Sequence, residues 1–387
     1  MTMRSLLLVL VFALPAAAER EQTPVCENDR FRIDADFASG DLDKCKFKSP
    51  NSVELTFRPE DFKVDDAFSW FSFRVNSSAS QQLDIRLRFP KSYPRFWPKL
   101  STDGVTWTRA PESTVESSGK DMYLTVSPNE RPLWISAQEL LATEWYAEWL
   151  AELNAHAELT VASIGESVEG RSIDIAKTGN KKEAIILIGR QHPTEIPGAI
   201  AMRDFVDVVI SDSELARQFR ERFTLLILPL VNPDGVANGH SRHNSGRTDL
   251  NRDWGSFKQP ETRAIAGLLS AMEELEMNPR LMLDFHATKF TKTLMFYTQT
   301  AEEVTDPPNF AVNWFAATRE RLPEFDFKHD PRPSQENPNT KGFFYRHYGI
   351  PAYTYELGDE ADRELIHQTT PVFAEEMMRE LLRAEPL

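Results

Sequence analysis

Residues 184–195 of this 387-residue chain read AIILIGRQHPTE, an apolar run followed closely by a histidine, His192, and a carboxylate, Glu195. A short apolar run that ends at a glycine is typical of a strand buried on both faces. The turn after it can aim both side chains at one point, and an imidazole with a carboxylate suits Zn²⁺. A loop histidine with an ordinary hydrogen bond is the alternative interpretation.

A second apolar run, residues 281–285, also ends in a histidine, His286. Two histidines at the ends of two buried strands of one sheet can meet at one ion and leave its fourth position open. Zinc in such a site lowers the pKa of a bound water to about 7 and polarises a carbonyl. We therefore predict one Zn²⁺ per chain, held by His192, Glu195 and His286.

Strands and helices alternate around these two runs from residue 136 to residue 387. This order predicts an α/β domain whose central sheet is covered on both faces, with its active site at strand ends. Strands are expected at 184–188, 223–230 and 281–285, and helices at 138–153, 197–210, 261–277 and 372–383.

The preceding segment, residues 24–135, has a different pattern. Apolar and polar residues alternate over short runs that turn residues interrupt, which is typical of half-buried strands. The segment is therefore predicted to be an antiparallel β-sandwich domain. Its clearest strands are expected at 52–57, 69–75, 83–89 and 122–126.

The first 18 residues have the pattern of an export signal. Arg4 precedes an apolar run, and small residues at 16–18 resemble a cleavage site. The run is too short to span a bilayer, so we expect a cleaved signal peptide at 1–18 and a periplasmic or secreted protein without a membrane anchor. A buried N-terminal strand is the alternative. In an oxidising compartment Cys26 and Cys45 are expected to form a disulfide rather than remain as two unrelated thiols.

The net charge of −15 argues against a nucleic-acid partner. Neutralising phosphates requires a basic face, so no nucleic-acid partner is expected. The sequence does not indicate an oligomeric state.

Several further motifs occur with the two histidine motifs in a fixed order along the chain, and together the set resembles the zinc carboxypeptidase family. The sandwich in front resembles the layout of its cytosolic-carboxypeptidase-like branch. The resemblance covers about residues 140–385 and implies a carboxypeptidase-like α/β/α domain with a mixed central sheet. It also implies that the substrate is the C-terminus of a peptide or protein. The matching segments are 164–173, 192–195, 232–235, 251–252, 284–286 and 355–357.

The resemblance also implies roles for individual residues. Glu356 is expected to be the general base, and Arg242 to stabilise the oxyanion. Asn251 and Arg252 are expected to bind the terminal carboxylate of the substrate. Asp249 is expected to accept a hydrogen bond from a ligand histidine. The alternatives are a polar strand-edge residue for Glu356 and a solvated loop arginine for Arg242.

The chain departs from the family pattern at two places. The interval from Glu195 to His286 is shorter than in the digestive members and closer to that of the cytosolic branch. Ser334 occupies the position of their mobile tyrosine, which puts that proton-donor role in doubt. Lys341 falls at the base of the specificity pocket and predicts a preference for a C-terminal Glu or Asp. An exposed loop lysine is the alternative interpretation.

Two rival functions remain open. The first is an exported amidase that trims cell-wall peptides at a D-glutamyl-diaminopimelate bond. The second is an inactive protein that binds carbohydrate or peptide through Trp70, Trp97 and Trp107 of the sandwich. Aromatic residues at strand positions are more often part of a core, and all three predicted ligands and the base are present.

Overall fold

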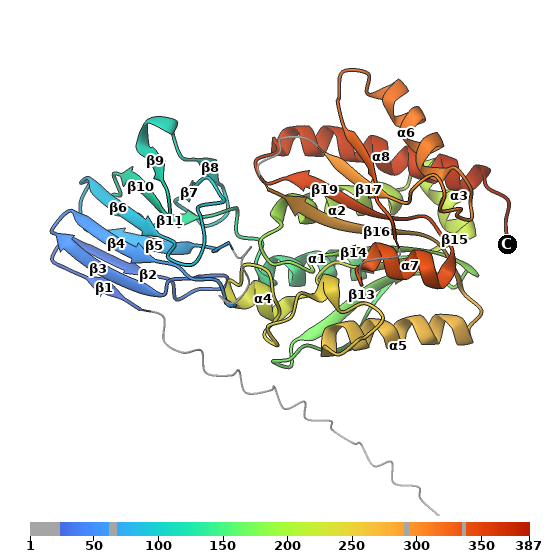
Figure 1. Ribbon diagram of the computed structural model, residues 1–387, viewed down its shortest axis with the longest axis horizontal. Helices are drawn as coiled ribbons and strands as arrows, with labels where there is room; N and C mark the ends of the chain where they lie inside the picture. The colour runs from blue at the N-terminus through green and yellow to red at the C-terminus, as the bar shows by residue number, and fades with distance from the viewer. Residues whose placement is uncertain (1–23, 62–67, 290–293, 335–337) are drawn as a thin grey trace, which may run out of the picture.

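A computed structural model describes residues 24–61, 68–289, 294–334 and 338–387 of the chain. A β-sandwich lies beside a larger α/β domain, and the sandwich strands come first in the chain (Figure 1). The expected signal peptide, residues 1–18, falls outside the described residues.

The sandwich consists of two sheets. The first has the order β1 (Cys26–Glu27), β2 (Phe31–Asp34), β5 (Ser72–Ser77), β11 (Leu133–Ser136), β7 (Lys99–Ser101) and β8 (Thr108–Arg109). The second has the order β3 (Lys44–Ser49), β4 (Ser52–Thr56), β6 (Leu83–Arg88), β10 (Asp121–Val126) and β9 (Val115–Ser118). A short 3₁₀ turn, η1 (Glu112–Thr114), precedes β9.

Alternation of side chains explains why these segments form a sandwich. On β6, Leu83, Ile85 and Leu87 are buried, whereas the residues between them lie toward solvent. Neighbouring strands in both sheets are antiparallel, as predicted, except that β4 and β6 run parallel. A Cys26–Cys45 disulfide joins β1 of one sheet to β3 of the other.

One mixed eight-stranded sheet forms the centre of the α/β domain. Its order is β12 (Leu159–Glu166), β13 (Ser172–Thr178), β15 (Phe223–Leu228), β14 (Glu183–Gly189), β16 (Asn278–Thr288), β19 (Ala352–Gly358), β17 (Met295–Thr298) and β18 (Lys328–Pro331). The four inner strands β15, β14, β16 and β19 are parallel to one another, whereas β13 and β17 pair with them in the antiparallel sense.

Helices cover both faces of this sheet, which confirms the predicted α/β/α class (Figure 1). On β14, Ile185 and Leu187 pack into one core with α1 (Thr143–Ala155), α2 (Ile196–Val209), α3 (Glu214–Arg222), α6 (Phe310–Arg321) and α8 (Arg363–Arg383). Ile186 and Ile188 pack into a second core with α5 (Pro260–Glu274) and α7 (Thr340–Tyr348). The short helices α4 (Pro233–Asn238) and η2 (Leu250–Arg252) lie in connecting loops. None of the described helices combines the length and apolar character that crossing a bilayer requires.

Two predicted helix starts are wrong. The helix expected from residue 138 begins at Thr143, and its N-cap is Ala142. The helix expected from residue 372 begins at Arg363 and passes through Pro371. Proline removes a helical hydrogen bond, but buried Ile366 and Phe373 lie on either side of it, so packing on the sheet maintains the helix.

Polar contacts join the two domains. The Ser39 hydroxyl of the sandwich donates to the carbonyl of Val236, at 2.7 Å, and Lys99 forms an ion pair with Glu360, at 2.8 Å. In the segment that connects the two domains, Gln138 Nε2 donates to the carbonyl of Asp359, at 3.1 Å. The sandwich therefore contacts the loops that follow the central strands.

Candidate active site

Three neighbouring strands bring the predicted residues to one edge of the sheet. Strand β16 lies between β14 and β19, and all three are parallel. Gly189 at the end of β14 is in register with Phe285, and His286 is in register with Glu356 on β19. Since parallel strands end at the same edge, residues distant along the chain become neighbours there.

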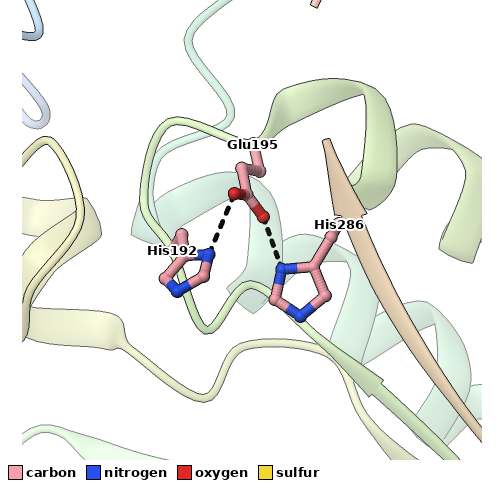
Figure 2. Close-up of side chains that lie close together, drawn as sticks. All are labelled: His192, Glu195 and His286. Carbon is pink, nitrogen blue, oxygen red and sulfur yellow. Dashed lines mark hydrogen bonds and ion pairs between the residues drawn. The ribbon is translucent and has the colours of Figure 1, made fainter. Parts of the chain in front are cut away.

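His192, Glu195 and His286 form the cluster that the sequence predicts (Figure 2). Their candidate ligand atoms lie within 4.8 Å of one another, and all three residues are buried. Nδ1 of His192 lies 2.9 Å from Glu195 Oε1, and Nδ1 of His286 lies 2.6 Å from Glu195 Oε2. Both imidazoles therefore present the same nitrogen to a single carboxylate.

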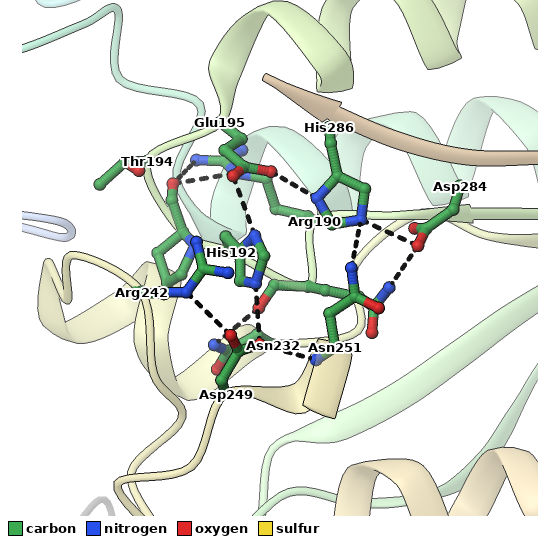
Figure 3. A network of polar contacts seen from close by, with 12 residues as sticks. Arg190, His192, Thr194, Glu195, Asn232, Arg242, Asp249, Asn251, Asp284 and His286 are labelled. Atoms are coloured by element: carbon green, nitrogen blue, oxygen red, sulfur yellow. Dashed lines mark hydrogen bonds and ion pairs between the residues drawn. The ribbon is translucent and has the colours of Figure 1, made fainter. Parts of the chain in front are cut away.

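The outer nitrogens of the two histidines face acceptors (Figure 3). Nε2 of His192 lies 2.9 Å from Asp249 Oδ1, and Nε2 of His286 lies 2.8 Å from Asp284 Oδ2. Gln191 Nε2 donates to the same oxygen of Asp284, at 2.7 Å. A histidine that ligates a metal characteristically donates its other N–H to a carboxylate. The arrangement thus fits a zinc ion on the Nδ1 side.

The charges within the cluster are strongly coupled. Burial opposes the ionised form of Glu195, but the neighbouring His192 and His286 outweigh it and hold the pKa of Glu195 well below its usual range. Burial likewise opposes a charged His286, but Asp284 and Glu195 raise its pKa well above the ordinary value. Buried charges of this kind require a partner, and a divalent cation that replaces the protons is a chemically suitable one.

The loop between β14 and α2 is held in shape by its own residues. Arg190 has a positive φ of 54°, and its Nε and Nη2 donate to the carbonyl of Pro193, at 3.0 and 2.7 Å. Glu195 is the N-cap residue of α2. A Cβ atom at Gly198 would lie 2.7 Å from the carbonyl oxygen of His286, so only glycine lets α2 approach β16 this closely.

Glu356 lies half-buried on β19, beside His286 in the sheet. Its shielded Oε2 has no hydrogen-bond partner among the described residues. Burial raises the pKa of Glu356 to about 7, helped by the charge of Glu195 and opposed by that of His286. A carboxylate with a pKa near neutrality can both accept and release a proton.

Arg242 lies in the loop after α4 and reaches the cluster through Asp249. Its Nε donates to Asp249 Oδ2, at 2.8 Å, while Oδ1 of the same carboxylate faces His192. Burial would raise the pKa of Asp249, but His192 and Arg242 hold it far below its usual range. The Asp249 carboxylate is thus shared between a candidate ligand and the candidate oxyanion residue.

Asn251 and Arg252 belong to η2, for which Asp249 is the N-cap. Thr340 donates to Asn251 Oδ1 through both its N–H and its hydroxyl, each at 3.0 Å, so Nδ2 faces His286, at 3.3 Å. Arg252 is exposed at the wall of the cleft and donates one bond to the carbonyl of Asn251, at 2.7 Å.

Lys341 lies on α7 and is buried, not an exposed loop lysine. Its Nζ donates to the carbonyls of Thr298 and Arg332, at 3.1 and 2.7 Å, and to the hydroxyl of Ser334, at 2.9 Å. Burial lowers the pKa of Lys341 to about 8, although Glu303 opposes the shift. Ser334, at the position of the family's tyrosine, is therefore a partner of the pocket lysine.

A cleft of about 270 Å³ is lined by most of the residues that the sequence singles out: His192, Glu195, Arg242, Asn251, Arg252, His286, Lys341 and Glu356, but not Asp249. Its charged side chains are mostly basic: Arg95, Arg242, Arg252, Lys289, Arg332 and Lys341 against Glu195 and Glu356.

Sequence reasoning missed four contributors to the site. Asp284 precedes His286 by two positions and so lies on the same strand face, a signal that was available in the sequence. Arg95 comes from the sandwich, Tyr297 comes from β17, and Arg332 comes from the loop after the edge strand β18. No local pattern marks these three residues, because only strand order brings them to the cleft.

Comparison with known families agrees with this geometry. Residues 146–379 match the family described as zinc carboxypeptidase, and residues 33–137 match the cytosolic carboxypeptidase N-terminal domain.

Individual relatives are more distant. Cytosolic carboxypeptidase 2 of Xenopus tropicalis is 34% identical over 323 residues, which cover 72% of this chain and 32% of the relative. Cytosolic carboxypeptidase 6 of mouse is 24% identical over 292 residues, which cover 66% of this chain and 52% of the relative. The chain thus spans about half the length of the mouse protein and about a third of the frog protein.

Solved structures are similar in fold across both domains. A metallo-carboxypeptidase from Burkholderia cenocepacia has a TM-score of 0.76 at 20% identity and covers 91% of this chain and 98% of its own. One from Pseudomonas aeruginosa has a TM-score of 0.73 at 21% identity and covers 90% and 97%.

The expectation of an exported, periplasmic or secreted protein is wrong by this comparison, because the mouse and frog relatives are named cytosolic carboxypeptidases. That expectation depended on the composition of residues 1–18, and a charged residue before a short apolar run is not a specific pattern. The cell-wall amidase loses its main support, which was export.

Proposed function

Because this chain belongs to the zinc carboxypeptidase family, we propose that it is a zinc-dependent carboxypeptidase that removes the C-terminal residue of a peptide or protein. The observation that carries the proposal is the convergence of His192, Glu195 and His286 beside Glu356 in one cleft. A zinc ion held by the first three residues would supply a Lewis acid that activates water and polarises the scissile carbonyl.

Glu356 acts as the general base in this proposal. It takes a proton from the attacking water and passes it to the leaving amine. A pKa of about 7, raised by burial, supports both transfers, because the group gains and loses a proton at small cost near neutral pH. The shielded Oε2 without a hydrogen-bond partner in the described chain faces no competing donor.

Arg242 stabilises the negative charge that develops on the carbonyl oxygen. Its Nε is fixed by Asp249, and within the described part of the chain no hydrogen bond is made by its Nη1 or Nη2. These two groups can therefore donate to a substrate oxygen in the cleft. Asp249 also orients His192, so one carboxylate sets the positions of both groups.

Asn251 and Arg252 bind the terminal carboxylate of the substrate. Both residues line the cleft, and a guanidinium can bond both oxygens of a carboxylate at once. Recognition of that carboxylate is what restricts cleavage to the last peptide bond.

A preference for an acidic C-terminal side chain follows from the charges of the cleft. Among the described residues Lys341 donates to two carbonyls and a hydroxyl, which are neutral, and Glu303 offsets its positive charge only in part, since burial still lowers the pKa of Lys341. Arg332 and Lys289 add positive charge at the wall.

The alternative of an inactive carbohydrate-binding sandwich has little structural support. The indole N–H of Trp70 donates to the carbonyl of Ser39, at 2.8 Å, and that of Trp97 to the carbonyl of Ala110, at 2.8 Å. The indole of Trp107 donates to Gly104, at 3.2 Å. Trp70 is also buried at the domain boundary. These three indole N–H groups therefore form hydrogen bonds within the sandwich.

Release of amino acids from synthetic peptides tests the proposal. The zinc-loaded protein should free the last residue of peptides that differ only in a terminal Glu, Phe or Lys, fastest for Glu, and a chelator should stop the reaction. Measured zinc should equal one ion per chain. Faster release of Phe or Lys would reject the acidic preference alone. Absence of hydrolysis with one zinc bound, or cleavage of muropeptides only, would reject the carboxypeptidase.

A further inference from the structure

Glu60 of the sandwich reaches across the domain boundary and binds the backbone of the loop that carries Arg242. Its Oε2 accepts the N–H of Ser241, at 2.7 Å, and its Oε1 accepts the N–H of Arg242, at 2.8 Å, and of His243. One carboxylate thus receives three consecutive backbone N–H groups. Such a concave set of N–H groups is an anion site, and here the anion is a side chain of the other domain.

The same loop is held on its opposite side by the candidate metal site. Thr194, which precedes Glu195, donates its hydroxyl to the carbonyl of Ser241, at 3.1 Å. The hydroxyl of Ser241 accepts the N–H of Trp70 from the sandwich, at 3.0 Å. The loop is therefore held by Glu60 and Trp70 of the sandwich and by Thr194 of the loop that carries His192 and Glu195.

A continuous series of contacts runs from Glu60 to the metal cluster. Glu60 holds the backbone of Arg242, the Arg242 side chain bonds to Asp249, and Asp249 faces His192. Every link is a hydrogen bond with at least one charged partner, and such bonds are stronger and more directional than neutral ones. Movement of the Ser241–His243 backbone must therefore move the Arg242 guanidinium.

We propose that Glu60 is a positioning residue of the active site, through which the sandwich fixes Arg242 where the oxyanion forms. The inference depends on the proposed role of Arg242. It assigns the sandwich a part in catalysis that needs no contact between Glu60 and the substrate. A displacement of about 1 Å in such a group can lower a rate by about 100-fold.

Glu60→Gln is the first variant, because it keeps the shape of the side chain while one acceptor oxygen becomes an NH₂ donor that opposes a backbone N–H. We expect kcat to fall about 10-fold to 100-fold, with KM within about twofold and one zinc still bound at saturating zinc. Glu360→Gln is the matched control. Glu360 also lies at the domain boundary, but its carboxylate pairs with Lys99 and, in the described part of the chain, does not contact the loop of Arg242. The kcat of this control variant should stay near that of the unaltered protein.

A double-variant comparison shows whether Glu60 acts through Arg242. If it does, Glu60→Gln adds little to the loss already caused by Arg242→Ala, because the guanidinium that Glu60 positions is then already absent. Multiplication of the two losses would overturn the inference. Equal losses in Glu60→Gln and Glu360→Gln would also overturn it, because they would indicate domain docking in general. If Glu60→Gln does not fold, Glu60→Asp keeps the charge and should have an intermediate kcat.

Hydrogen exchange supplies a measurement that does not depend on activity. The amides of Ser241, Arg242 and His243 should exchange faster in Glu60→Gln than in the unaltered protein, and at the unaltered rate in Glu360→Gln. Unchanged exchange and unchanged kcat in Glu60→Gln, with zinc-dependent hydrolysis intact, would reject the inference and leave the proposed function in place. Absence of hydrolysis in the unaltered protein would reject the proposed function, and the exchange rates would still decide whether Glu60 holds the loop.

Discussion

Arg95 of the sandwich and Asp359 of the α/β domain form a buried ion pair with two parallel hydrogen bonds. Nε donates to Oδ2, at 2.8 Å, and Nη2 donates to Oδ1, at 3.0 Å. The two side chains are 7% and 0% exposed. Because Arg95 also lines the cleft, this pair fixes one wall of the candidate site relative to the sheet.

Removing one member of this pair should destabilise the protein. Arg95→Met leaves the Asp359 carboxylate buried without its partner, a loss of about 3–5 kcal/mol in the free energy of unfolding. The matched control is Arg109→Met, since Arg109 is 45% exposed and lies 3.8 Å from Glu360, and such a pair contributes about 0–1 kcal/mol. Urea denaturation measures both. Equal losses would contradict the expectation, and Arg95→Met with Asp359→Asn should recover part of the loss.

Asp284→Asn should weaken zinc binding. The asparagine cannot orient and polarise His286 as the carboxylate does, and loss of such a partner lowers metal affinity by about 10-fold to 100-fold. Competition with a chelator of known affinity measures the change. Asp306→Asn, which removes a carboxylate that pairs with Arg280 outside the cleft, should bind zinc normally. An unchanged affinity in Asp284→Asn would contradict a metal at Nδ1 of His286.

Glu356→Gln should lower kcat by about 100-fold to 10,000-fold while one zinc remains bound, because the amide cannot accept the proton. In the unaltered protein kcat should fall as the pH decreases through the pKa of Glu356, since only the carboxylate is a base. Without zinc, burial places that pKa at about 7, and a bound cation lowers it, so the acid limb should lie at or below pH 7. An acid limb well above pH 7 would be inconsistent with this base.

Tyr297→Phe should reduce kcat/KM about 2-fold to 10-fold, the loss of one neutral hydrogen bond. Tyr297 lines the cleft on β17, and burial together with the charge of Glu356 raises its pKa, so the phenol is a neutral donor at pH 7. Tyr345→Phe is the control. Tyr345 lies on α7 and, among the residues that the structure describes, is not one that lines the cleft. Steady-state kinetics with one peptide compares them, and equal rates for all three proteins would exclude a role for Tyr297.

Lys341 should make the acidic preference depend on pH. Burial lowers its pKa to about 8, so the ammonium is charged below that pH and loses its charge as the pH rises through it. KM for a peptide with a terminal Glu should therefore increase as the pH rises through about 8. KM for a peptide with a terminal Phe should show no such increase. Lys341→Met should remove this increase with pH and raise KM for Glu at all pH values. A Glu-specific increase that persists in Lys341→Met would assign the preference to another group.

The main elements and the candidate metal ligands could be predicted from local sequence. Apolar runs at 184–188 and 281–285 indicate buried strands, and side chains just beyond strand ends gather at one edge of a sheet, so His192, Glu195 and His286 could be placed together. The boundaries of α1 and α8 could not be placed, because packing on the sheet overrides the local preferences of residues such as Pro371.

Tertiary structure alone decided how the site is completed. Strand order places β17 beside β19 and so brings Tyr297 to the cleft. Domain docking brings Arg95 to the cleft and Glu60 to the loop of Arg242 from the sandwich. The residue pattern within one segment does not encode such contacts, because they depend on how segments distant along the chain pack against one another. The candidate ligands and the class of chemistry could therefore be predicted from local sequence. The residues that surround the ligands and alter their pKa values come from distant segments, so long-range packing decides them.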